Sequence, residues 1–163
     1  MSKVTNVVIA GLGGQGVLKA SDILADAALR AGYDVKKSEI HGMSQRGGSV
    51  SSDVRFAAGE GSVRSPMVPT GEADFLLVLT ADQVDVNRGA IAHNPTGVLI
   101  APDVIDEASL SNRRSLNVAM LGALAAHLRI DEACWLEAIK ANLPEKVYEA
   151  NVEAFRAGLR AGA

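Results

Sequence analysis

The stretch Val4-Thr-Asn-Val-Val-Ile-Ala-Gly-Leu-Gly-Gly-Gln-Gly16 decides the fold. It is an apolar run, rich in β-branched residues, that ends on a cluster of glycines and is followed at once by a helical pattern. Such a run is typical of a parallel strand that is covered on both faces. Gly11, Gly13 and Gly16 have the G-x-G-x-x-G spacing of dinucleotide-binding folds. The stretch therefore predicts a strand, a glycine turn and a helix whose unpaired first amides favour an anion.

The rest of the chain alternates strand and helix patterns. A helix over 14–31 and a strand over 34–39 complete a βαβ unit with the first strand. Alternating residues predict a half-buried strand over 50–56, with 62–65 as a short antiparallel partner. Further strands are expected over 73–79 and 98–101, and further helices over 81–92, 116–128, 131–141 and from Pro144 onward. We predict one domain, residues 1–163, with a three-layer, Rossmann-like α/β fold, a mainly parallel sheet and an antiparallel hairpin.

Two of these helices start with capping patterns. Thr80 and Gln83 have the spacing of a capping box for the helix over 81–92. Asp131 stands at the N-terminal cap of the helix over 131–141.

The composition narrows the function. The chain has 163 residues, of which 48% are hydrophobic, so a real core is expected. Its net charge of −3 and lack of a long basic run argue against nucleic acid as the main partner. Cys134 is the single cysteine, whereas an iron–sulfur cluster takes about four thiolates, so any cluster must lie on a partner. His41, His93 and His127 lack metal-ligand spacing, so no metal site is expected.

The location is also constrained. No apolar run approaches the ~20 residues of a membrane span, so no membrane association is expected. The first strand begins too near Met1 for a signal peptide. A cytoplasmic protein is therefore expected, in agreement with the single cysteine.

A second loop, His41-Gly-Met-Ser-Gln-Arg-Gly-Gly-Ser49, follows the second predicted strand. It is too polar and too rich in glycine for a helix or a strand. It lies just past the carboxyl end of that strand, at the edge where open α/β sheets bind ligands. We therefore expect this loop and the glycine turn to lie side by side at one edge of the sheet.

The two loops together resemble one family. Gly-Leu-Gly-Gly-Gln-Gly (11–16) and Ser-Glu-Ile-His-Gly-Met-Ser-Gln-Arg-Gly-Gly-Ser-Val (38–50) are similar to the gamma domain of the 2-oxoacid:ferredoxin oxidoreductases, and most similar to the small (beta) subunits of the indolepyruvate type. Weaker matches extend the resemblance over nearly the whole chain; they are Val-Arg-Phe (54–56), Ser-Pro (65–66), Gly-Glu-Ala-Asp (71–74), Asn-Val-Ala-Met-Leu-Gly (117–122) and Asn-Val-Glu-Ala-Phe-Arg-Ala-Gly (151–158).

This resemblance implies a function. Such enzymes use thiamine diphosphate to decarboxylate a 2-oxoacid oxidatively, pass electrons through iron–sulfur clusters to ferredoxin, and form an acyl-CoA. It implies that thiamine diphosphate and the clusters lie on other subunits, so that this chain has no catalytic residue of its own and needs a catalytic partner. It also implies that the chain helps to form or cover the coenzyme A region. The implied substrate is indolepyruvate or another aryl pyruvate.

The candidate binding residues all lie in the two loops. They are Gly11, Gly13, Gly14, Gln15, Gly16, His41, Ser44, Gln45, Arg46 and Gly47. The glycines form either a backbone cradle for a phosphate or a neighbouring subunit, or only a tightly packed turn. Gln15 either contacts a ligand or completes the turn. Arg46 either grips a carboxylate or phosphate or forms an interdomain salt bridge. His41 is either a polar contact beside the thiamine pocket or a hydrogen-bonded loop residue.

Two other functions remain open from the residues alone. An NAD(P)-dependent oxidoreductase would use the glycine turn and Glu39, which follows Gly16 by 23 positions. A binding module or homodimer without a catalytic partner would use the same loops for contact alone.

Overall fold

The computed structural model describes residues 3–41 and 48–163, with His41 described by its backbone alone. Within these ranges the strands are β1 (Thr5–Leu12), β2 (Tyr33–His41), β3 (Ser49–Ala58), β4 (Phe75–Val78) and β5 (Val98–Ile100). The α-helices are α1 (Val17–Arg30), α2 (Val84–Asn87), α3 (Leu116–Ala125), α4 (Glu132–Asn142) and α5 (Tyr148–Gly162). Short 3-10 turns lie at Ala81–Gln83, Arg88–Ile91, Pro102–Val104, Glu107–Ser109, Arg113–Ser115 and Glu145–Val147.

The strands form one sheet in the order β2-β3-β1-β4-β5. β1, β4 and β5 are parallel, while β3 runs antiparallel to both of its neighbours, β1 and β2. β2 therefore has the same direction as β1, and β3 alone is reversed. The α/β fold with a mainly parallel sheet is confirmed, and β1, α1 and β2 form the predicted βαβ unit with one strand inserted between its two strands.

The antiparallel hairpin involves other strands than predicted. β3 pairs with β2 from Tyr33 opposite Ala58 to His41 opposite Val50. Residues 62–65, the predicted partner, form no strand. Glycines with positive φ angles, at 59 and 61, turn the chain away after β3. The segment that follows is attached to the sheet by a side chain and not by strand pairing. The carboxylate of Asp34, in β2, accepts a hydrogen bond from the Val63 amide at 2.8 Å.

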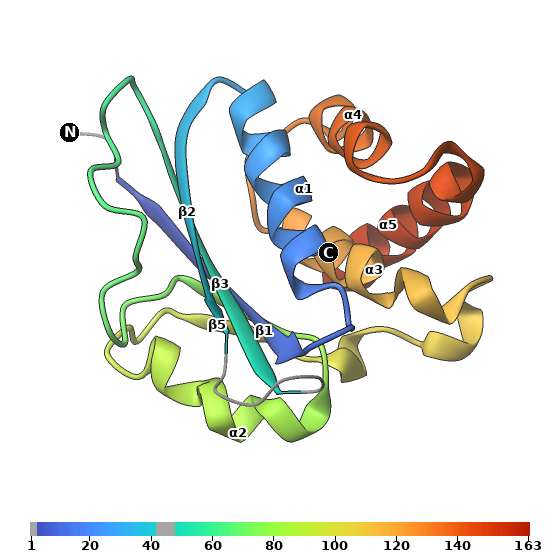
Figure 1. Cartoon of the computed structure of the whole chain (residues 1–163), viewed down its shortest axis with the longest axis horizontal. Helices are drawn as coiled ribbons and strands as arrows, with labels where there is room; N and C mark the ends of the chain where they lie inside the picture. Colours follow the sequence, from blue (N-terminus) through green and yellow to red (C-terminus); the bar gives the residue numbers. More distant parts are fainter. Residues whose placement is uncertain (1–2, 42–47) are drawn as a thin grey trace.

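The core lies mainly between the sheet and one layer of helices. Val7 and Ile9 of β1 are fully buried against α1, α3, α4 and α5, which Figure 1 shows gathered on one side of the sheet. The opposite face of β1 and β4, with Val8 and Leu76, is covered by a thinner layer that includes α2 and its flanking 3-10 turns. α3 and α5 pack so closely that a Cβ on Gly158 would collide with the backbone of Ala119, so only glycine fits there. These are the three predicted layers.

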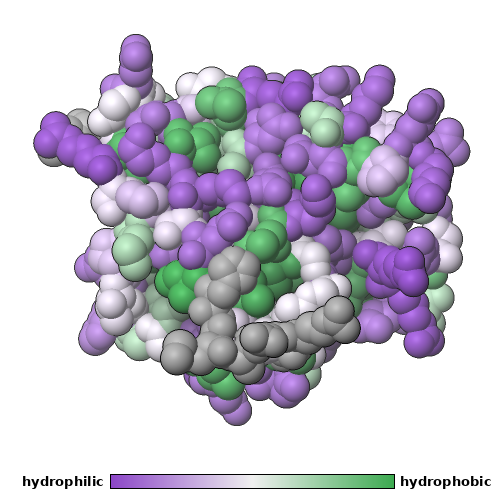
Figure 2. All heavy atoms as spheres, viewed as in Figure 1, coloured by the Kyte–Doolittle hydropathy of each residue, from purple (hydrophilic) through white to green (hydrophobic). Residues whose placement is uncertain are grey.

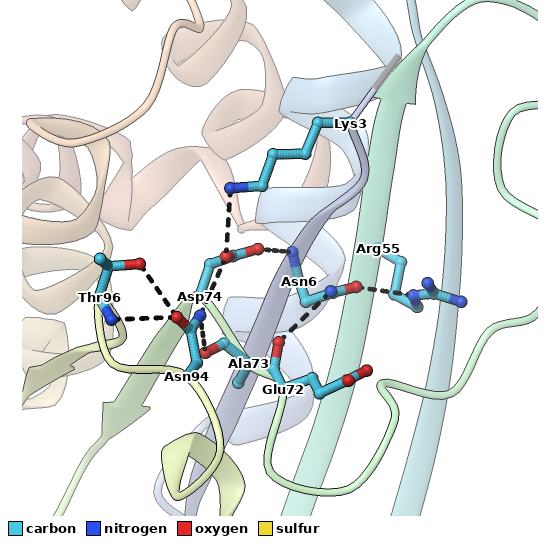
Figure 3. A network of polar contacts seen from close by, with 8 residues as sticks. All are labelled: Lys3, Asn6, Arg55, Glu72, Ala73, Asp74, Asn94 and Thr96. Carbon is cyan, nitrogen blue, oxygen red and sulfur yellow. Dashed lines mark hydrogen bonds and ion pairs between the residues drawn. The ribbon is translucent and has the colours of Figure 1, made fainter. Parts of the chain in front are cut away.

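A polar network fixes the amino end of β1 (Figure 3). Asn6 donates its amide to Asp74 Oδ2 at 2.8 Å, and the Asp74 amide donates back to the Asn6 carbonyl at 2.8 Å. Arg55 Nε of β3 donates to Asn6 Oδ1 at 2.7 Å, and Asn94 donates to Asp74 Oδ1 at 3.2 Å. The network lies at the end of the strand away from the glycines, so it holds the sheet together without occupying the candidate site.

The helix expected over 81–92 is interrupted, and the prediction of a capping box at its start is wrong. The structure has only the short α2 between two 3-10 turns, and Thr80 makes no side-chain capping bond. Gln83 is instead buried, and its Oε1 accepts a hydrogen bond from Ser49 Oγ at 2.8 Å. Gln83 thus holds the start of β3 from the neighbouring layer. Asp131 does stand at the cap of α4, but without a side-chain hydrogen bond.

Candidate functional site

The glycine turn between β1 and α1 is shaped by two left-handed residues. Gly14 and Gly16 have φ angles of 87° and 83°, which residues with a side chain rarely adopt. The Gln15 side chain folds back, and its Oε1 accepts a hydrogen bond from the Leu12 amide at 2.7 Å. A Cβ on Gly11 would meet that same oxygen, so Gly11 leaves room for it. Gln15 thus completes the turn, and its contact with a ligand stays a prediction.

Asn117, from the first turn of α3, fixes the end of this loop. Its Nδ2 donates to the Gly16 carbonyl at 3.2 Å, and its Oδ1 accepts from the Val118 amide at 3.0 Å. A Cβ on Gly16 would collide with the Asn117 side chain. The residue is 8% exposed, so it is a rigid support. The Asn-Val-Ala-Met-Leu-Gly segment (117–122) is part of the family resemblance, but nothing in its pattern indicates contact with the glycines.

The two loops meet at one edge of the sheet, as predicted. The Gly13 amide donates to the Gly48 carbonyl at 2.9 Å, and Leu12 at the end of β1 pairs with Ser49 at the start of β3. The remaining candidates of the second loop, Ser44, Gln45, Arg46 and Gly47, lie outside the described residues, as does the side chain of His41. Their roles stay predictions.

A cavity of about 610 Å³ opens beside the glycine turn. Its lining residues are Gly14, Gln15, Gly16, Leu79, Arg113, Arg114, Leu116 and Asn117. Leu79 follows β4, and its amide donates to the Ala10 carbonyl of β1 at 2.9 Å. The cavity therefore lies past the carboxyl ends of two adjacent parallel strands. The chain leaves β1 toward β2 and leaves β4 toward β5, on opposite sides, and such a reversal is where open α/β sheets bind ligands.

The cavity is electropositive. Arg113 and Arg114 are exposed on the 3-10 turn before α3, which Asn112 caps by accepting the Arg114 amide at 2.9 Å. Neither arginine forms an ion pair within the part of the chain that the structure describes. Leu116 and Asn117 of the first turn of α3 border the cavity, as does Gly16, the residue that precedes α1. No described side chain caps α1, so its first amides have no side-chain partner. No described acidic residue lines it. The site is thus suited to a phosphate or carboxylate.

Glu39 does not lie where a nicotinamide-binding fold would need it. In such folds the second strand neighbours the first. Here β3 separates β2 from β1, so two strand spacings, about 10 Å in all, intervene. The Glu39 carboxylate accepts a hydrogen bond from Lys37 Nζ at 2.7 Å, and Lys37 also pairs with Asp22 of α1. Glu39 therefore belongs to a surface ion-pair cluster.

The remaining residues considered from the sequence have packing roles. The ring of His127 packs against Phe75 with centroids 5.7 Å apart, and the ring of His93 lies against Gly71. Cys134 is a half-buried free thiol in α4.

Over residues 3–41 and 48–163, no group of three or more His, Cys, Asp or Glu side chains is placed to hold a metal ion. None of the described helices is long and apolar enough to cross a membrane.

Comparison with known proteins identifies the family. The pattern of the family described as "Pyruvate ferredoxin/flavodoxin oxidoreductase" matches residues 6–161. "Indolepyruvate oxidoreductase subunit IorB" of Thermococcus kodakarensis is 33% identical, over 98% of this chain and 96% of its own length. The chain belongs to the pyruvate ferredoxin/flavodoxin oxidoreductase family, and the resemblance found in the two loops is confirmed.

Two solved structures have the same fold. The gamma subunit of keto/oxoacid ferredoxin oxidoreductase from Geobacter sulfurreducens is 25% identical, with a TM-score of 0.74 over 97% of this chain and 98% of that chain. The 2-oxoglutarate:ferredoxin oxidoreductase of Magnetococcus marinus, whose structure contains 2-oxoglutarate, coenzyme A and succinyl-CoA, is 21% identical. Its TM-score is 0.80 over 99% of this chain and 31% of that longer chain. The chain is thus a subunit of the 2-oxoacid:ferredoxin oxidoreductase type.

Proposed function

We propose that this chain is the small subunit of a cytoplasmic indolepyruvate or aryl pyruvate ferredoxin oxidoreductase, and that its glycine turn holds the phosphates of coenzyme A. The substrate proposal is supported by the relative from Thermococcus kodakarensis, which matches almost end to end. The coenzyme proposal depends on one observation above all, the pair Arg113 and Arg114 beside Gly14–Gly16.

Coenzyme A suits this cavity chemically. It carries a diphosphate and a separate phosphate, and phosphates are bound by free amides at helix starts and by arginines. The amides at the start of α1 and the side chains of Arg113 and Arg114 would hold these groups. Asn117 would keep the turn in the required shape, since it grips the Gly16 carbonyl. Arg46 and His41 would complete the same edge from the second loop.

The proposal divides the reaction between subunits. Thiamine diphosphate, which stabilises the carbanion formed on loss of CO₂, and the iron–sulfur clusters that lead to ferredoxin would be held by the partner subunit. This chain would orient coenzyme A and close the site against water at the edge formed by the two loops. Its own residues perform no bond-breaking step.

The test is reconstitution of the enzyme with and without this chain. Indolepyruvate-dependent, coenzyme-A-dependent reduction of ferredoxin is expected only when the thiamine-bearing subunit and this chain are both present. Full activity of the thiamine-bearing subunit alone would contradict the proposal. Micromolar binding of NADH by the isolated chain would favour the nicotinamide alternative instead.

A further inference from the structure

A second hollow lies on the face of the sheet that α2 covers, away from the cavity beside the glycine turn. It has a volume of about 240 Å³. Its lining includes Val8, Ser51, Asp53, Val68 and Val86. The walls are apolar on the side of Val68 and Val86, while Ser51 and Asp53 of β3 lie on the sheet side. The hollow therefore combines apolar walls with one acidic group.

Asp53 is an unusual residue for such a place. It is 7% exposed, and its Oδ2 accepts a hydrogen bond from the Val68 amide at 2.9 Å. No described cation pairs with it. Arg55, on the same strand face, donates instead to Asn6 Oδ1 and to the Ser65 carbonyl. Burial raises the pKa of Asp53, against the opposing effects of the Val68 amide and Arg55. A buried carboxylate with no ion pair to a described side chain costs stability, which a cation entering the hollow would recover.

The rim of the hollow is hydrophobic and exposed. Among the described residues only Leu29, Ile40, Met67 and Val86 are large, hydrophobic and exposed. Val86 lines the hollow and Met67 precedes Val68, while Ile40 pairs with Ser51 and so shares its face of the sheet. Figure 2 shows hydrophilic side chains over much of the face drawn there, with smaller hydrophobic patches between them. Exposed apolar residues that gather on one part of a surface are typical of interaction sites.

We propose that this hollow, with Asp53 at its base and Ile40, Met67 and Val86 on its rim, docks a lysine or arginine side chain of the thiamine-bearing subunit. This inference rests on the proposed function, since that subunit is the partner. A basic side chain fits because its methylene stem suits apolar walls while its charged end pairs with a carboxylate. The rim residues would pack around it and exclude water, as in the centre of a protein interface.

The test compares three variants of this chain, each co-expressed with the thiamine-bearing subunit. Val86→Asp places a charge on the rim, and Asp53→Asn removes the charge while keeping an acceptor for the Val68 amide. Leu29→Asp is the matched control, because Leu29 is 63% exposed and Val86 is 65% exposed, and Leu29 lies on α1 at the other face. Thermal unfolding of each variant verifies that it is folded.

We expect Val86→Asp to raise the dissociation constant of the two subunits about tenfold or more, and Asp53→Asn to raise it about fivefold. Leu29→Asp should leave it near the wild-type value. A photo-cross-linking amino acid at position 86 should attach to a peptide of the thiamine-bearing subunit that contains lysine or arginine, and one at position 29 should not.

Two results separate the inference from the proposed function. If the wild-type chain forms no complex with the thiamine-bearing subunit, the proposed function fails and the inference fails with it. If the wild-type complex forms but Val86→Asp and Asp53→Asn bind as Leu29→Asp does, or if position 86 cross-links to a second copy of this chain, only the docking inference is overturned.

Discussion

The Asn117 side chain donates a hydrogen bond to the carbonyl of Gly16 at 3.2 Å, although the two residues are 101 positions apart. The same carbonyl also accepts the first bond of α1, from the Ala20 amide at 2.9 Å. The bond thus ties the glycine turn to the first turn of α3. Because Arg113 and Arg114 immediately precede α3, it also sets their position relative to the free amides of α1. This contact therefore joins two parts of the cavity wall, Gly14–Gly16 and Arg113–Asn117.

Replacing Asn117 by alanine should therefore loosen the site. We expect Asn117→Ala to cost about 1 kcal/mol of stability, the worth of an ordinary hydrogen bond, and to raise the KM for coenzyme A about tenfold with a smaller effect on the KM for the 2-oxoacid. The measurement is steady-state kinetics of the reconstituted enzyme. Asn151→Ala is the control. Asn151 lies in α5, far along the chain from the glycine turn; it is equally buried but donates its hydrogen bond to the Val147 carbonyl. Equal effects of both variants on the KM for coenzyme A would refute a role in positioning.

The two left-handed glycines should differ in their tolerance of a side chain. Gly14→Ala should cost about 1 kcal/mol from its backbone conformation alone, because nothing lies near its added Cβ. Gly16→Ala should cost clearly more, because its Cβ would also collide with Asn117. The double variant Gly16→Ala/Asn117→Ala should be less destabilised than the sum of its single variants. Denaturant unfolding gives the three free energies, and strict additivity would argue against the collision.

The two arginines should contribute charge to ligand binding and little to folding. Arg113→Ala/Arg114→Ala should raise the KM for coenzyme A at least about tenfold and weaken its dependence on salt, while the unfolding midpoint stays near that of the wild type. Arg160→Ala is the matched control, since Arg160 is an exposed arginine near the end of α5. An unchanged KM in the double variant, with Arg160→Ala behaving alike, would remove the arginines from the site.

The pH dependence of stability should report on Asp53. Burial raises the pKa of this carboxyl in the folded chain, so the native state retains the proton at pH values where the unfolded chain has lost it. Stability from this group is therefore greatest below its ordinary pKa of about 3.9 and falls as pH rises through the folded pKa. Asp53→Asn lacks this titration. Its stability relative to the wild type should improve from about pH 3.5 to about pH 7, as measured by denaturant unfolding, and a constant difference would contradict the shift.

The sequence was sufficient for the architecture because the main signals are local. The apolar run that ends on glycines, the helical spacing of α1 and the second glycine-rich loop each predict their own conformation, and the edge at which they meet follows from chain direction. Pairing partners were harder to predict. The periodicity predicts the strand over 50–56, but its partners are β1 and β2 and not residues 62–65, because pairing is decided by contacts that periodicity does not encode.

The site was only half visible in the sequence. The glycines are evident from their spacing, but Asn117, Arg113 and Arg114 reach the same cavity from about a hundred residues later. Exposed arginines and a helical asparagine have many ordinary roles, so nothing local distinguished them. Gln83 shows the opposite case, in which a local pattern misleads. Its spacing from Thr80 fits a capping box, but its side chain accepts a hydrogen bond from Ser49 of another layer.

The most direct measurement is a structure of the reconstituted enzyme, with this chain and the thiamine-bearing subunit, in the presence of coenzyme A. The account predicts that a phosphate of coenzyme A lies within hydrogen-bond distance of the amides at the start of α1 and of Arg113 or Arg114. Coenzyme A bound wholly on the partner subunit, with the cavity beside Gly16 filled by the partner's side chains or by water alone, would contradict it.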